Sequence, residues 1–180
     1  MALPITASYL VLVVLADPAL ENLGVPLIAA HMIVFWLSQD SNITPPVCLG
    51  AYVAASIAGA DPWKTGWMSF RFAKMLYVVP LLFAYTPILL AGSAGLVIWV
   101  MVSALIGTLA FSAWTMGYLA RKTSILEWIV LGGAAALSFT PAQFIFRGGV
   151  SGYALNVVGA ALLGGIFLWQ WRSPDLAAAS

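Results

Sequence analysis

The sequence predicts an all-α, polytopic transmembrane helical protein, and three observations carry that prediction. Of the 180 residues, 63% are hydrophobic and only 7% are charged, whereas soluble domains contain about 25% charged residues. The mean hydropathy is +1.02. Several apolar segments also reach the roughly 20 residues that a helix needs to cross the hydrocarbon core of a bilayer. The chain is therefore expected to be an integral membrane protein.

The charged and metal-binding residue types exclude several functions. Seven basic and six acidic residues give a net charge of +1, so no basic stripe exists that could neutralise the phosphates of a nucleic acid. The chain has one cysteine, Cys48, and one histidine, His31. These exclude a disulfide framework, a Cys/His zinc site and a haem held by two histidines. We therefore expect no bound cofactor and no nucleic-acid partner.

The first apolar segment, Ile5–Ala16, has 12 residues and is too short to cross a membrane. We interpret it as the second arm of a re-entrant hairpin. The dipeptide Asp17-Pro18 that follows is typical of a helix N-cap with proline at the first helical position. It predicts that a new helix begins there.

The next two apolar runs, Pro26–Leu37 and Val47–Ala58, flank the polar stretch Ser38–Pro46. Each run spans about 18 Å as a helix, so two halves and a break fill a core about 30 Å thick. Proline disfavours the helical conformation of the residue before it. The pattern predicts one discontinuous helix with its break at membrane depth. An aqueous loop between two short interfacial helices is the alternative.

Four longer segments are predicted to span the membrane, the first with Arg71 and Lys74 reaching towards the headgroups. Asp61-Pro62 predicts a helix N-cap, and Ser124 with Glu127 predicts a capping box. The glycines at 132, 133, 159, 164 and 165 suit close helix packing. The predicted spans are Met68–Leu90, Ala94–Ala120, Ile125–Phe146 and Val150–Trp171.

The basic residues predict the orientation of these spans, because cytoplasmic loops carry an excess of lysine and arginine. With alternating spans, six of the seven basic residues fall on one side and only Arg147 falls on the other. We assign the side with six to the cytoplasm, which places the C-terminus inside. Tryptophans near the span ends are typical of an interfacial belt in contact with membrane lipid.

Five segments of the first half resemble one known family. They are Leu3–Ala7, Gly24–Pro26, Ala29–His31, Ser38–Val47 and Ala58–Gly66. Together they resemble the C-terminal part of the large membrane subunit of tripartite ATP-independent periplasmic (TRAP) transporters. More narrowly, they are similar to the fused permeases that join 4 and 12 transmembrane helices in one chain.

The resemblance implies a component of a sodium-coupled secondary transporter in the bacterial inner membrane, and not an enzyme. Such a transporter takes up organic acids delivered by a periplasmic substrate-binding protein, and its transport domain moves as an elevator. Residues 1–91 would belong to that domain, and residues 92–180 would form three additional transmembrane helices. The remaining permease domain, or a small membrane subunit, is a further implied partner.

The family's hairpin tip reads roughly Gly-Met-Gly-hydrophobic-Pro-Thr-Thr, and Met1 falls on its internal methionine, with Ala2 and Ile5 as departures. We therefore expect the chain to be a C-terminal fragment of a longer permease. We also expect it to transport nothing by itself.

The break is the predicted site for ion and substrate. Sodium prefers hard oxygen ligands, which the carbonyls of a broken helix and nearby side chains provide. Asn42 and Thr44 are the predicted sodium ligands. The resemblance implies that Thr6, beside the hairpin tip, contributes to the same site. A polar hinge that only forms hydrogen bonds between helices is the alternative. The full set of candidates is Thr6, Ser38, Asp40, Ser41, Asn42, Thr44, Pro45 and Pro46.

His31 lies outside the break, in an apolar half-helix. A hydrogen bond between helices is favoured for it over a proton relay.

No paired catalytic motif supports an intramembrane enzyme. A non-catalytic membrane scaffold or anchor within a larger assembly is the alternative function, although such a protein has no reason to keep a polar break at membrane depth.

Overall fold

The computed structural model describes residues 4–90, 92–143 and 151–172. In these ranges every regular element is a helix, which confirms the all-α prediction. Four of the described helical segments are long and apolar enough to cross a membrane, which agrees with a polytopic membrane protein: Ile5–Asn22, Pro62–Tyr85, Ala94–Met116 and Gly152–Arg172. The chain divides into two compact units, Met1–Tyr85 and Thr86–Ser180, which are considered separately.

The first unit begins with α1 (Ile5–Asn22), which is longer than the predicted 12-residue arm. The prediction that Asp17 caps a new helix is wrong, because α1 continues through Pro18 and Asp17 lies inside it. Proline inside a helix removes one backbone hydrogen bond, and such a break is tolerated where neighbouring groups compensate. The chain reverses at Gly24, whose φ of +82° favours glycine.

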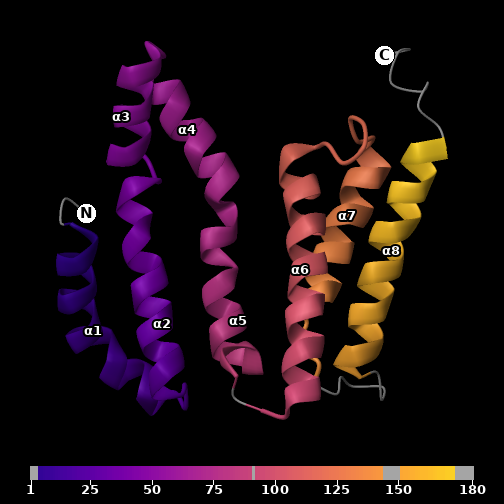
Figure 1. The fold of residues 1–180 in the computed structure, drawn as a ribbon, viewed down its shortest axis with the longest axis horizontal. Helices are drawn as coiled ribbons and strands as arrows, with labels where there is room; N and C mark the ends of the chain where they lie inside the picture. Colours follow the sequence, from indigo (N-terminus) through magenta and orange to yellow (C-terminus); the bar gives the residue numbers. More distant parts are fainter. Residues whose placement is uncertain (1–3, 91, 144–150, 173–180) are drawn as a thin grey trace. The chain divides into compact units, whose positions relative to one another are not determined.

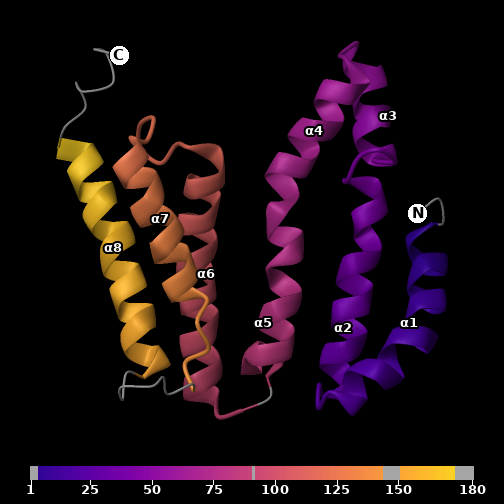
Figure 2. The same cartoon turned by 180° about the vertical axis from the view of Figure 1, so that it is seen from behind.

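The predicted discontinuous helix is present in the first unit. α2 (Leu27–Ser38) is followed by a 3-10 turn, η1 (Gln39–Asn42), and then by α3 (Leu49–Ala58). Figures 1 and 2 both show α3 continuing in the direction of α2 beyond the break. α2 packs against α1 and against α5, and α3 packs against α4.

The last segment of this unit starts earlier than predicted, at Pro62 instead of Met68. Asp61 caps it as expected, since its carboxylate accepts a hydrogen bond from the Lys64 backbone N–H at 3.0 Å. The segment then runs without a loop to Tyr85. Its parts are α4 (Pro62–Phe72), η2 (Ala73–Tyr77) and α5 (Val79–Tyr85).

The second unit contains a short 3-10 turn, η3 (Pro87–Leu89), and three helices that pack against one another. Two of them, α6 (Ala94–Met116) and α8 (Gly152–Arg172), follow the predicted spans closely. α6 ends at Gly117, whose φ is +68°. The third, α7 (Ile125–Ser138), has only 14 residues. The prediction of a span to Phe146 is wrong over residues 139–143, which are described and not helical. Residues 144–146 lie outside the described range. Figures 1 and 2 show α7 beside α6 and α8 within this unit.

Small residues let these three helices approach closely. The buried core of the unit is formed by Ala110, Ala134 and Ala135, with phenylalanine and leucine side chains packed around it. A Cβ added to Gly159 would lie 2.8 Å from the backbone oxygen of Ala134, whereas one added to Gly164 would meet no atom within 4 Å. The packing role predicted for the glycines therefore holds for Gly159 and not for Gly164 within this chain.

The C-terminal end of α7 is capped by a side chain from α8. The Asn156 amide donates to the backbone oxygens of Leu137, Ser138 and Thr140 at 3.1, 3.2 and 2.9 Å. Its own oxygen accepts from the Trp99 indole at 3.1 Å, and Asn156 is only 4% exposed. A helix leaves its last carbonyl groups without partners inside the helix. Asn156 supplies partners for them where α7 stops.

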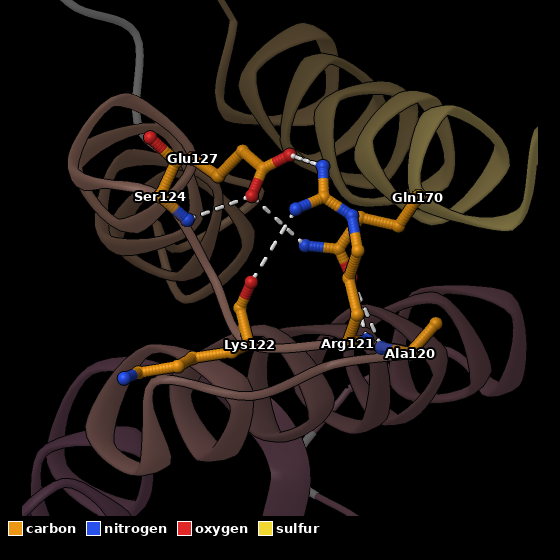
Figure 3. A network of polar contacts seen from close by, with 6 residues as sticks. All are labelled: Ala120, Arg121, Lys122, Ser124, Glu127 and Gln170. Carbon is orange, nitrogen blue, oxygen red and sulfur yellow. Dashed lines mark hydrogen bonds and ion pairs between the residues drawn. The ribbon is translucent and has the colours of Figure 1, made fainter. Parts of the chain in front are cut away.

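A second polar network closes the other end of this three-helix unit (Figure 3). Glu127 forms the predicted capping box with Ser124, and it also accepts from Arg121 at 2.7 Å and from the Gln170 amide at 3.1 Å. The Gln170 oxygen accepts from the backbone N–H groups of Ala120 and Arg121 at 3.0 and 3.3 Å. The network therefore joins the loop after α6 to both α7 and α8.

Candidate functional site

The helix break places two of its predicted side chains together. Asp40 lies in η1, and Thr44 follows one turn later, so the Thr44 hydroxyl can donate to Asp40 Oδ1. The backbone N–H of Thr44 also donates to the Asp40 carbonyl at 2.9 Å. Both side chains are half-buried. The break thus holds a carboxylate in a fixed position at the end of α2.

A third member of this cluster comes from η2 and was not predicted from the sequence. The Tyr77 hydroxyl donates to Asp40 Oδ1 and lies 2.9 Å from Thr44 Oγ1. Tyr77 is 41% exposed, so the cluster lies at the surface of the first unit. No local signal marks Tyr77, because it lies 37 positions after Asp40 within an apolar segment. Asp40, Thr44 and Tyr77 are called the break cluster below.

The other candidates in the break have different surroundings. Ser38 is buried and its hydroxyl donates to the Phe35 carbonyl of its own helix at 2.6 Å. The Pro46 carbonyl accepts from the Tyr52 hydroxyl at 2.8 Å. Pro45 and Asn42 are half-buried. A Cβ added to Gly66 would lie 3.6 Å from Pro45 Cγ, and one added to Gly50 would lie 3.3 Å from the Asn42 backbone oxygen. Ser41 belongs to η1, but its side chain lies outside the described part of the structure.

Thr6 belongs to another part of the unit. It lies in the first turn of α1 and lines a pocket of about 410 Å³ between α1 and α2, together with Tyr9, His31 and Phe35. His31 Nδ1 and the Tyr9 hydroxyl are hydrogen-bonded at 2.8 Å, which confirms the bond between helices expected for His31. His31 Nε2 also lies 3.7 Å from Asp17 Oδ2. Neither Tyr9 nor Asp17 was predicted as a partner.

The donor atoms of the break cluster are hard oxygens, a carboxylate and two hydroxyls. Such ligands suit alkali and alkaline-earth cations better than soft transition metals. Across the described ranges, His, Cys, Asp and Glu do not gather in any group of three or more that could hold a metal ion. The chemistry available at the break is therefore that of a small hard cation or of a hydrogen-bonded polar hinge.

Comparison with known proteins concerns the unit that contains the break. A model of the family described as "Tripartite ATP-independent periplasmic transporter, DctM component" matches residues 1–89. No curated protein and no solved structure matches the chain significantly. The match covers α1 through η3, and with them the helix break and the break cluster. Residues 1–89 of the chain are therefore similar to the DctM component, the large permease component, of tripartite ATP-independent periplasmic transporters.

Proposed function

We propose that this chain is part of the permease of a sodium-coupled TRAP transporter that takes up organic acids into bacteria. The DctM family supports a permease role and a multi-pass membrane location. A role in transport accounts for the polar residues of the helix break, so no enzymatic function is needed to explain them. The sodium coupling, the organic acid substrate and the inner-membrane location with a cytoplasmic C-terminus are our proposals.

The break cluster is the observation that carries this function. A carboxylate that accepts hydrogen bonds from two hydroxyl groups is costly to maintain in an apolar environment. A membrane scaffold does not need such a group. Discontinuous helices in secondary transporters expose backbone carbonyls near the bilayer midplane, where they coordinate coupling ions.

The proposed coordination uses the residues predicted from the sequence together with Tyr77. Asp40 supplies negative charge and the hydroxyl of Thr44 supplies a neutral oxygen next to it, while Asn42 would supply a further oxygen from the same break. Tyr77 orients the Asp40 carboxylate through a hydrogen bond. A cation bound there links α2, α3 and η2, and its binding favours one arrangement of these elements. The organic acid would bind nearby, where the cation offsets its negative charge.

The proposed partners follow from the family. TRAP permeases generally work with a periplasmic binding protein and another membrane subunit. We propose that the binding protein delivers the organic acid to the first unit. The remaining permease domain, or the small subunit, would provide the scaffold against which this unit moves.

Uptake by the assembled transporter in proteoliposomes, with its binding protein, tests the proposal. Asp40→Asn removes the charge at the break and should abolish sodium-dependent uptake while leaving the protein folded. Asp61→Asn is the matched control, because asparagine also caps helices and Asp61 lies outside the break. Uptake by Asp40→Asn with unchanged sodium dependence would overturn the ion-site assignment and favour the scaffold alternative.

A further inference from the structure

The surface of α4 carries aromatic and basic side chains in neighbouring rows. Trp63, Trp67 and Phe70 follow one another at intervals of four and three positions, which places them on the same face of a helix. Their ring centroids lie 6.0 Å apart for the first pair and 5.9 Å for the second, with the rings edge-on. The two tryptophans are 55% and 51% exposed. These three residues are called the aromatic row.

Lys64 and Arg71 form a second row beside the first. They lie seven positions apart, so they project from nearly the same direction and are separated by about 10 Å along the helix axis. Both side chains are exposed. Trp67 lies about 60° around the helix from Lys64, so the cations border the aromatic row.

Basic residues outnumber acidic residues along this segment of the sequence. Lys64, Arg71 and Lys74 are three of the seven basic residues of the chain, and no acidic residue occurs between Asp61 and Glu127. Asp61 itself lies at the start of α4, where its carboxylate binds the backbone N–H of Lys64. The face of α4 that carries both rows therefore presents positive charge next to exposed aromatic rings.

We propose that this face of α4 binds an anionic phospholipid of the surrounding bilayer, with Lys64 and Arg71 on its phosphate group and the aromatic row against the glycerol and acyl chains. Tryptophan rings favour the membrane interface, and basic side chains near a helix end reach the headgroups. A zwitterionic lipid carries its own cation and gains less from the two basic residues. A free phosphate ion has no acyl chain to contact the aromatic row.

Lipid binding to the purified chain tests this proposal independently of transport. The chain is freed of lipid in dodecyl maltoside and titrated with phosphatidylglycerol or phosphatidylcholine, and bound lipid is counted by native mass spectrometry. Phosphatidylglycerol should bind more tightly. Each of Lys64→Gln and Arg71→Gln should weaken its binding about fivefold. Trp67→Leu should weaken the binding of both lipids.

Two controls keep the test specific. Lys122→Gln removes an exposed lysine from the second unit and should leave phosphatidylglycerol binding unchanged. The paired exchange Lys64→Arg with Arg71→Lys keeps both charges and should bind like the parent, with the same circular dichroism spectrum. Equal binding of the two lipids, or unchanged binding by the Lys64→Gln/Arg71→Gln double variant, would overturn the proposal. Displacement of phosphatidylglycerol by an equal concentration of inorganic phosphate would also overturn it, since the site would then be a simple anion site.

Discussion

The hydroxyl group of Tyr77 donates a hydrogen bond to the carboxylate of Asp40, and so connects η2 to the break between α2 and α3. Both groups also contact the Thr44 hydroxyl. The three side chains come from two different segments of the first unit. The position of the Asp40 carboxylate therefore depends on a residue outside the break.

Replacing Tyr77 by phenylalanine removes only the hydroxyl group and should impair sodium coupling more than folding. A typical hydrogen bond contributes about 1 kcal/mol, or somewhat more to a charged group. We expect the sodium concentration for half-maximal uptake to rise by about fivefold to tenfold. Sodium titration of uptake by the assembled transporter measures this, with Tyr118→Phe, an exposed tyrosine of the second unit, as the control. Equal sodium dependence in the two variants would contradict a role for Tyr77 at the break.

A cysteine introduced at Asn42 tests whether the break lies at membrane depth and faces water. The native Cys48 is fully buried, so the introduced thiol should dominate the labelling. We expect Asn42→Cys to react with a water-soluble maleimide in membranes and to be protected by sodium. A cysteine at Leu23, which is 80% exposed in the turn after α1, provides the comparison. Labelling at position 42 that matches position 23 and ignores sodium would indicate an exterior loop.

Replacing Asn156 by leucine should strongly destabilise the second unit. The substitution leaves the carbonyls at the end of α7 and the Trp99 indole without their partner. Each buried polar group left unpaired costs about 1–3 kcal/mol. We expect the midpoint of thermal unfolding in detergent to fall by several degrees or more. Trp99→Phe removes one of these bonds and should cause a smaller fall, so an equal or larger fall for Trp99→Phe would contradict the dominant role of Asn156.

Alanine substitutions at two glycines of α8 should have opposite consequences. Gly159→Ala places a methyl group 2.5 Å from Ser138 Oγ and 2.8 Å from the Ala134 carbonyl, so α7 and α8 must separate. Overpacking of this kind costs about 1–3 kcal/mol. Gly164→Ala meets no atom within 4 Å and should be neutral or slightly stabilising, since alanine favours the helix by about 1 kcal/mol. Thermal unfolding of the two variants side by side measures the difference, and similar midpoints would contradict the observed packing.

The parts of the structure that the sequence predicts well depend on neighbours along the chain. The Asp61 cap and the Ser124–Glu127 capping box need only three positions of separation, so their patterns are visible without a fold. The break was also visible, because polar residues and two prolines interrupt an apolar run. The same Asp-Pro pattern gave a wrong N-cap prediction at Asp17, because α1 continues through Pro18. The Asp17 carboxylate lies near His31 instead.

The residues that sequence reasoning missed have partners far along the chain. Tyr77 and Asp40 are 37 positions apart, and Asn156 and Trp99 are 57 positions apart. Tyr77 and Asn156 each lie in an apolar stretch, where a single polar residue has no periodic pattern. Their roles follow from the packing of helices, and packing between distant segments cannot be read from local propensity.

The network around Gln170 has a consequence for the order in which the second unit is completed during synthesis. Arg121 and Glu127 are six positions apart and can pair as soon as that stretch has left the ribosome. The backbone N–H groups of Ala120 and Arg121, however, bind Gln170, which is made about fifty residues later. Until α8 enters the bilayer, the junction between α6 and α7 lacks its acceptor and can still rearrange. Insertion of α8 therefore acts as the closing step of assembly, and ribosome stalling before Gln170 should leave α6 and α7 accessible to membrane proteases.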